Sequence, residues 1–535
     1  MPTYKITGGT PLNGTIRIGG SKNAVLPLLA STLLVKEPCK FTNVPEISDV
    51  DVMLDILQGI GATVTRDKKS RTVIVDTTDA EVFDITGKGK NGKDLQALSG
   101  KIRASYYFLG ALLARFGQAI TPSGTGGDKI GRKRIMNYHI DGLKTLGATI
   151  VLDDSQKKYL SSVNNSSLLV NKNRLLGNFF HFREITVGAT VNMILASVTA
   201  RGVTVLENAA QEPHIINLIN FLNSLGAKIE QTTRKVMVEK DGSLRQESWF
   251  VLTITGVESL HSPAAGEAEP KKLLRRKASE DRVPAIECEV IPDSIEACTY
   301  MSCAVATGGN VTLTYVEPAH LKTIAAVLSR LGADVDFFED TVDGRKDVPC
   351  VTVSMSGHPH YTFLPEQEKA SGKFFFKSSI SDNTTDDLLK PDSNGDHMLE
   401  AKPYPYFPTD MQPFAGVLMA MTCSDDPQNP NNKGIIKESV WDSRFGYLTE
   451  LNKMQANTNS PESRFGEFYG VRQLKGAEVN AIDLRAGAAL IVAGLAADGV
   501  TTVYDEAGWV ARGYENLLEK LLKLKASIEV IDVTD

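Results

Sequence analysis

A glycine-rich segment from Ser123 to Arg134 contains one carboxylate, Asp128, among four basic residues. Glycine allows the backbone to approach a ligand closely, and Lys and Arg side chains recognise phosphate and carboxylate groups. An acid among these cations is therefore a candidate proton donor or acceptor beside a bound anion. The alternative is a solvated turn with balanced charges. No Gly-Lys-Ser/Thr sequence closes the segment, so it is not a P-loop.

A second candidate anion site lies near the N-terminus. The strand-like stretch Thr15–Ile18 is followed by two glycines, Ser21, Lys22 and Asn23, and then by a helical pattern. Backbone N–H groups, the helix dipole and an ammonium group would together attract an anion there. A capped helix with an exposed lysine is the alternative.

Further candidates stand at the starts of helical patterns. Arg103 precedes an apolar helix, and Asp410 follows a proline-containing turn before another. Arg444, Arg485 and Arg512 also lie near helix starts, where the dipole disfavours cations and a ligand anion would stabilise them. The alternatives are a solvated cation at Arg103, a helix cap at Asp410 and salt bridges for the other three.

The elements that must position these residues repeat along the chain. A helical pattern ends in a Leu-Gly-Ala-like stop and continues into a short β segment at six places: Ile60–Ala62, Leu146–Ala148, Leu225–Ala227, Leu331–Ala333, Met454–Ala456 and Leu524–Ala526. Glycine commonly ends a helix in the left-handed conformation. Alternating helices and strands predict an α/β fold. The grouping of the copies predicts two similar halves, divided between about residues 240 and 290.

Polar stretches interrupt this pattern and are interpreted as five surface insertions: Asp153–Asn178, Lys240–Arg282, Glu366–Lys402, Asp425–Lys433 and Asn457–Arg464. The basic run Lys271–Lys277 could bind a polyanion, but a solvated loop is the favoured interpretation.

Composition limits the class of protein. At 535 residues, more than one domain is expected. The net charge of −6 gives no general attraction to nucleic acid or to an anionic membrane. Six scattered cysteines without a Cys-x-x-Cys pair favour a reducing cytoplasm over disulfides or zinc. The N-terminus shows no signal-peptide pattern, and the most apolar segment, Ala486–Ala497, is too short to span a bilayer.

Together, these segments closely resemble the UDP-N-acetylglucosamine 1-carboxyvinyltransferases, the enolpyruvyl transferases of peptidoglycan synthesis. The resemblance runs from Tyr4 to Val530, apart from the five polar segments. The matching segments are Leu12–Gly14, Ser21–Pro27, Arg103–Ser105, Gly126–Asp128, Val187–Thr190, Glu207–Pro213, Ile291–Asp293, Phe407–Asp410, Ser443–Phe445, Asp483–Ala486 and Arg512–Tyr514.

The resemblance implies two inside-out α/β barrel domains of three repeated units each, with the active site in the cleft between them. Residues 21–290 would form the first domain, and residues 1–20 with 291–535 the second. It also implies the reaction, which is the first committed step of peptidoglycan synthesis and so serves cell-wall biogenesis, cell shape and division. The enolpyruvyl group of phosphoenolpyruvate passes to the 3′-hydroxyl of UDP-N-acetylglucosamine, and phosphate is released. It implies no cofactor, no metal and only small-molecule partners.

The resemblance also assigns roles to residues. Lys22, which is also implied to be catalytic, and Arg512 would hold phosphoenolpyruvate, with Arg444 and Arg485 nearby. Asp410 would accept the proton of the sugar 3′-hydroxyl. Those implied to contact the sugar nucleotide are Asn23, Arg103, Arg134 (or Lys133), Thr186, Val187 and Val440. The choice between Arg134 and Lys133 arises because Gly131–His139 is one residue longer than the usual family segment.

Asp128 departs from the family pattern, because most members have a cysteine there, which donates a proton to the methylene carbon. An unperturbed aspartate has a pKa of about 3.9, so burial or substrate charge would have to raise the pKa of Asp128. Position 184 is also Glu where a lysine is frequent, and Arg183 is a candidate substitute on the diphosphate.

Two other functions are compatible with parts of the sequence. The shikimate-pathway enolpyruvyl transferase has the same fold and donor, but there the N-terminal lysine is followed by serine, whereas Asn23 follows Lys22 here. A non-catalytic, sugar-nucleotide-binding paralogue would fit the insertions and the altered loop. The presence of Lys22, Asp128, Asp410 and Arg512 together argues against it.

Overall fold

The computed structural model describes residues 2–81, 85, 87–120, 137–151, 167–170, 174–240, 242–261, 286–361, 388–389, 396–422 and 433–532. These form two compact units. The N-terminal unit contains the described residues from 20 to 291, and the C-terminal unit contains residues 2–19 and those from 292 to 532.

The C-terminal unit contains three four-stranded sheets in its described part. In each sheet, one parallel strand pair is extended by two antiparallel strands. Strands β1 and β2, from the start of the chain, complete two of these sheets. The sheets are β2(Asn13–Arg17), β14(Asn310–Thr314), β16(Arg345–Ser354) and β15(Asp334–Val342); β17(His397–Ala401), β18(Gly434–Glu438), β20(Phe465–Phe468) and β19(Thr458–Glu462); and β21(Glu478–Asn480), β22(Val500–Tyr504), β1(Pro2–Thr7) and β23(Ser527–Asp532).

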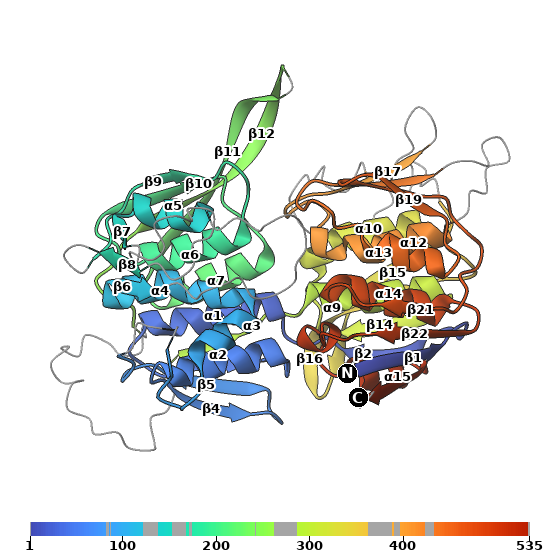
Figure 1. Ribbon diagram of the computed structural model, residues 1–535, viewed down its shortest axis with the longest axis horizontal. Helices are drawn as coiled ribbons and strands as arrows, with labels where there is room; N and C mark the ends of the chain where they lie inside the picture. The colour runs from blue at the N-terminus through green and yellow to red at the C-terminus, as the bar shows by residue number, and fades with distance from the viewer. Residues whose placement is uncertain are drawn as a thin grey trace. The chain divides into compact units, whose positions relative to one another are not determined.

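Three helices of the C-terminal unit are buried on all sides and pack against one another: α9(Ser294–Thr307), α12(Gln412–Met421) and α14(Leu484–Ala496). A helix that is hydrophobic all round belongs in an interior, so the sheets lie outside the helices (Figure 1). Three amphipathic helices each end just before the outermost strand of a sheet: α10(Lys322–Arg330), α13(Tyr447–Lys453) and α15(Leu517–Lys523).

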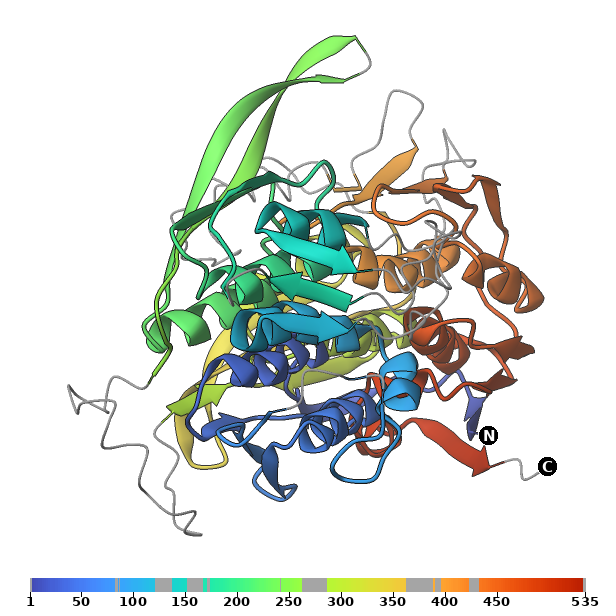
Figure 2. The same cartoon turned by 60° about the vertical axis from the view of Figure 1, so that its left-hand side comes forward.

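The N-terminal unit repeats this plan. Its sheets are β13(Ile286–Glu289), β3(Cys39–Thr42), β5(Thr72–Asp76) and β4(Thr63–Asp67); β9(Phe179–His181), β10(Val203–Glu207), β12(Ser243–Thr255) and β11(Lys228–Lys240); and β6(Gln118–Ile120), β8(Ser167–Val170) and β7(Ala148–Val151). Its helices are α1(Lys22–Ser31), α2(Ser48–Gly59), α3(Leu95–Lys101), α4(Tyr107–Phe116), α5(Asn137–Thr145), α6(Val187–Ser197) and α7(Pro213–Ser224). The β11–β12 hairpin projects beyond its sheet (Figures 1 and 2).

All six predicted helix stops are confirmed. The four glycines have φ between 88° and 98° and each follows a helix: Gly61, Gly147, Gly226 and Gly332. In the two copies that lack glycine, Met454–Ala456 and Leu524–Ala526, the corresponding residues Gln455 and Lys525 also have positive φ, at 63° and 69°. The α/β fold of two inside-out units, each with three repeats, therefore agrees with the sequence prediction.

The interpretation of the polar stretches as surface insertions was partly wrong. Asn457–Arg464 contains β19, which pairs with β20, and three of the other stretches contain β8, β12 and β17. Most of β19 is exposed, and an edge strand with exposed faces carries the polar composition that marks a loop. Most of Asp425–Lys433 lies outside the described residues.

Candidate active site

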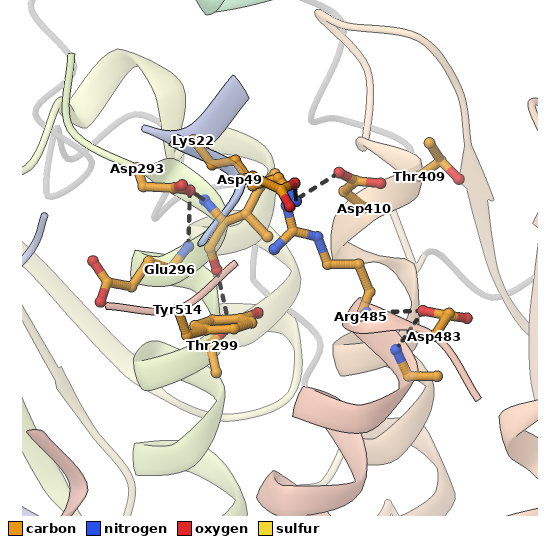
Figure 3. Close-up of polar contacts among 12 residues, drawn as sticks. Lys22, Asp49, Asp293, Glu296, Thr299, Thr409, Asp410, Asp483, Arg485 and Tyr514 are labelled. Atoms are coloured by element: carbon orange, nitrogen blue, oxygen red, sulfur yellow. Dashed lines mark hydrogen bonds and ion pairs between the residues drawn. The ribbon is translucent and has the colours of Figure 1, made fainter. Parts of the chain in front are cut away.

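Lys22 begins α1 in the N-terminal unit, as the glycine turn before it predicted. Its ammonium nitrogen lies 2.6 Å from a carboxylate oxygen of Asp49 in the first turn of α2, and both side chains are largely buried (Figure 3). Asn23 is the next residue of α1 and is half-buried. Asp49 thus orients the ammonium group that was predicted to bind an anion.

A second group of predicted residues lies around His139. Thr186 is the N-cap of α6 and Val187 is its first residue. A Cβ atom added to the next residue, Gly188, would lie 3.1 Å from Nε2 of His139. Arg103, at the start of a 3₁₀ turn, is close enough for its charge to oppose protonation of the same ring. Arg103 and the first turn of α6 therefore both lie near His139.

Buried polar contacts fix the state of His139. Burial, and secondarily Arg103, lowers its pKa to about 3, so the ring is neutral near pH 7. Its Nδ1 lies 2.8 Å from the side-chain nitrogen of Asn192, which also donates to the Tyr106 carbonyl. Because the Asn192 nitrogen is a donor, Nδ1 accepts and the proton resides on Nε2, on the side that faces Gly188.

The C-terminal unit holds Asp410 between two arginines. Asp410 lies in the 3₁₀ turn Thr409–Met411 that leads into α12. One carboxylate oxygen is 3.0 Å from Nη2 of Arg444, and the other is 3.4 Å from Nη2 of Arg485. Figure 3 shows the Arg485 guanidinium facing this carboxylate. Both arginines are nearly fully buried, whereas the Asp410 side chain is 31% exposed.

Arg485 belongs to a wider buried cluster. It lies in the first turn of α14, where the helix dipole disfavours a cation. Burial would lower its pKa, but Asp410, Tyr514 and Asp293 outweigh that effect and the pKa is raised. The Tyr514 ring lies 5.8 Å from the guanidinium carbon, and its hydroxyl is 2.9 Å from the hydroxyl of Thr299 on α9. Arg485 therefore stays charged.

The remaining predicted residues that the structure describes are Val440 and Arg512. Val440 lies two residues beyond β18, and its backbone N–H donates to Glu438 at 2.8 Å. Arg512 ends the 3₁₀ turn Val510–Arg512, with its guanidinium 5.0 Å from the centre of the Trp509 ring. Asp128, Lys133 and Arg134 lie outside the described residues, so their predicted roles are untested.

Three buried polar residues that contact or neighbour the predicted ones were not predicted from the sequence: Asp49, His139 and Glu438. Asp49 has the pattern of a helix-start acid, and Glu438 that of a strand end. Each acts through a partner at least 27 positions away, which no local pattern reveals. A carboxylate held by two arginines can accept a proton from a hydroxyl group, while the nearby cations attract anionic substrates. Among the described residues, no group of three or more acidic, His or Cys side chains could hold a metal ion.

The comparisons with known proteins identify the family. The chain belongs to the EPSP synthase (3-phosphoshikimate 1-carboxyvinyltransferase) family, whose sequence profile matches residues 6–253, 271–365 and 390–521. It is an enolpyruvyl transferase, which takes its group from phosphoenolpyruvate and passes it to a hydroxyl acceptor.

Curated relatives match along the full length. The UDP-N-acetylglucosamine 1-carboxyvinyltransferase 3 of Caldanaerobacter subterraneus subsp. tengcongensis is 32% identical over 529 residues, which is 99% of both chains. The protein of the same name from Symbiobacterium thermophilum is 34% identical over 532 residues, covering 99% of this chain and 98% of the relative.

Solved structures share the fold. The enolpyruvyl transferase NikO from Streptomyces tendae superposes with a TM-score of 0.69 at 23% identity, covering 99% of this chain and 98% of NikO. EPSP synthase from Acinetobacter baumannii gives a TM-score of 0.61 at 15% identity, covering 99% of this chain and all of the other. In the described part of the chain, no helix has the length and apolar character needed to cross a membrane.

Proposed function

We propose that this enzyme transfers the enolpyruvyl group of phosphoenolpyruvate to the 3′-hydroxyl of UDP-N-acetylglucosamine. The observation that carries the proposal is the Asp410 carboxylate held by Arg444 and Arg485, each on a different oxygen. This gives a hydroxyl acceptor a base that is ionised and fixed in direction. Full-length identity of 32–34% to UDP-N-acetylglucosamine 1-carboxyvinyltransferases supports that acceptor over shikimate 3-phosphate.

In the proposed reaction, Asp410 takes the 3′-hydroxyl proton while the sugar oxygen bonds to the enol carbon of phosphoenolpyruvate. Asp128 donates a proton to the methylene carbon, which becomes a methyl group. Loss of one methyl proton and of phosphate then regenerates the double bond and leaves the enol ether. Positioned proton transfers of this kind typically accelerate reactions by about 10²–10⁴-fold.

The proposed substrate contacts divide by charge. Lys22 and Arg512 bind the anionic groups of phosphoenolpyruvate. The N-terminus of α6, with Thr186 and Val187, offers backbone N–H groups to the diphosphate, and Arg103 adds charge. Asn23 and Val440 contact the sugar nucleotide, as does Arg134 or, alternatively, Lys133. The product would enter peptidoglycan synthesis in the cytoplasm, a reducing compartment that the scattered cysteines favour.

Phosphate release from phosphoenolpyruvate tests the proposal. The purified enzyme is assayed with UDP-N-acetylglucosamine, with shikimate 3-phosphate and without an acceptor. We expect rapid release only with UDP-N-acetylglucosamine. Release only with shikimate 3-phosphate would establish the rival acceptor. Tight binding of UDP-N-acetylglucosamine without release would support the non-catalytic paralogue.

A further inference from the structure

Glu438, at the end of β18, is a fully buried carboxylate beside the Asp410 site. One of its oxygens accepts the backbone N–H groups of Val440 and Trp441, at 2.8 and 3.1 Å. Its other oxygen accepts the hydroxyl of Thr409 at 2.8 Å. Glu438 thus joins the turn after β18 to the turn that carries Asp410.

The hydrogen bonds through Glu438 have a fixed direction. Backbone N–H groups and guanidinium nitrogens can only donate. Nη1 of Arg444 lies 3.1 Å from the Thr409 hydroxyl oxygen, so this oxygen must accept there. The Thr409 proton is then free to point only toward Glu438. The result is a series of hydrogen bonds from Glu438 through Thr409 to Arg444. The other terminal nitrogen of Arg444 contacts Asp410.

Charge balance agrees with an ionised Glu438. The pKa of the Glu438 carboxyl group is raised by burial, and Arg444 and the three donors limit that rise. Among the described residues, each hydrogen bond to the carboxyl group comes from a donor, and an ionised carboxylate accepts all three. Asp410 and Glu438 then offset the charges of Arg444 and Arg485, which keeps two buried guanidinium groups stable.

We propose that Glu438 is a positioning residue that orients Arg444, and through it Asp410, by fixing the direction of the Thr409 hydroxyl. The inference rests on the proposed role of Asp410 as the base. It predicts that removing the negative charge of Glu438 slows the chemical step more than it weakens acceptor binding, because the contacts to Val440 and Trp441 need only one oxygen.

Glu438→Gln makes the test specific. The amide oxygen can still accept both backbone N–H groups, but the amide nitrogen donates to Thr409 and competes with Arg444. We expect kcat to fall about tenfold or more, whereas the KM for the acceptor should change by less than about threefold. Thr409→Val, which removes the hydroxyl group, should give a similar loss, and Thr409→Ser should restore turnover.

The double variant Glu438→Gln/Thr409→Val tests whether Glu438 and Thr409 act through the same series of hydrogen bonds or independently of each other. Residues that act through one another give non-additive losses, so the double variant should be about as slow as the slower single variant. Multiplied losses, or a Thr409→Val variant as active as Thr409→Ser, would overturn the inference. If Glu438→Gln does not fold, the comparison of Thr409→Val with Thr409→Ser still tests the role of the Thr409 hydroxyl group.

Glu400→Gln is the matched control. Glu400 lies on the neighbouring strand β17 and accepts the hydroxyl of Ser439 at 2.7 Å, but it makes no hydrogen bond to Thr409 among the described residues. Its turnover should stay within about twofold of wild type. All variants are assayed with whichever acceptor supports turnover in the wild-type enzyme. An error in the identity of the acceptor is therefore distinguishable from an error in the role of Glu438.

Discussion

At the scale of single residues, the site depends on Asp410 as an ionised and oriented carboxylate. Asp410→Asn keeps the shape of the side chain but removes its basicity and places an amide nitrogen opposite an arginine. We expect kcat to fall by about a hundredfold or more. Asp442→Asn is the control, since Asp442 is exposed and pairs with Arg464, and exposed pairs contribute little. Near-normal turnover in Asp410→Asn would show that Asp410 is not the base.

Fosfomycin inactivates the UDP-N-acetylglucosamine 1-carboxyvinyltransferases, which this chain resembles, through their loop cysteine, and the proposed alignment puts Asp128 at that position. We expect no time-dependent inactivation of the wild-type enzyme by fosfomycin in the presence of UDP-N-acetylglucosamine. Burial raises the pKa of every described cysteine thiol: Cys39, Cys288, Cys298, Cys303 and Cys350. Thiols of this kind are poor nucleophiles.

Asp128→Cys is the complementary variant in the fosfomycin experiment. It should gain irreversible, stoichiometric inactivation if Asp128 occupies the family's cysteine position. Inactivation of the wild type at a similar rate would reveal another nucleophile or a wrong alignment of the loop.

Local sequence allowed some of the site to be predicted, but not the contacts that orient it. Asp410, Arg444 and Arg485 were identified from their places near helix starts, and the structure brings these three together. Glu438 and Asp49 were missed. Their partners come from other elements, and a buried carboxylate at a strand end or in a first helical turn has the same local pattern as an ordinary one.

At the scale of secondary-structure elements, each repeated helix stop requires a residue with positive φ. Gly226 has a φ of 88°, and a Cβ atom added to it would have no other atom within 4 Å. Gly226→Ala should therefore lower the free energy of unfolding by about 1 kcal/mol through backbone strain alone. Gly100→Ala is the matched control, because Gly100 lies in α3 with the same open space and no positive φ. It should raise stability by up to about 1 kcal/mol. Urea unfolding measures both, and equal shifts would contradict the explanation.

The polar stretches are expected to differ in their importance. Deleting residues 271–282, which contain none of the segments that carry the family resemblance, should leave turnover largely intact. Deleting residues 458–462 removes β19 and exposes the hydrogen-bonding edge of β20, so the soluble yield of enzyme should collapse. Activity and yield of the two variants, purified in parallel, measure the contrast. A folded, active enzyme without 458–462 would mean that β19 is not a structural strand.

At the scale of the whole molecule, much of the fold follows from one repeated pattern. Three sheets recur in each unit, and the six helix stops, each of which comes just before an edge strand of a sheet, were visible in the sequence. The outer strands were harder to predict. β19 and the outer part of β12 are exposed and polar, so their pairing with neighbouring strands, and not their hydrophobicity, defines them.

The identity of the product tests the central claim most directly. The enzyme is incubated with phosphoenolpyruvate and UDP-N-acetylglucosamine, and the purified product is analysed by mass spectrometry and NMR. The account predicts an enolpyruvyl ether at the 3′-oxygen of the sugar, formed in equal amount to the released phosphate. No modified sugar nucleotide, in an enzyme that modifies shikimate 3-phosphate under the same conditions, would contradict it.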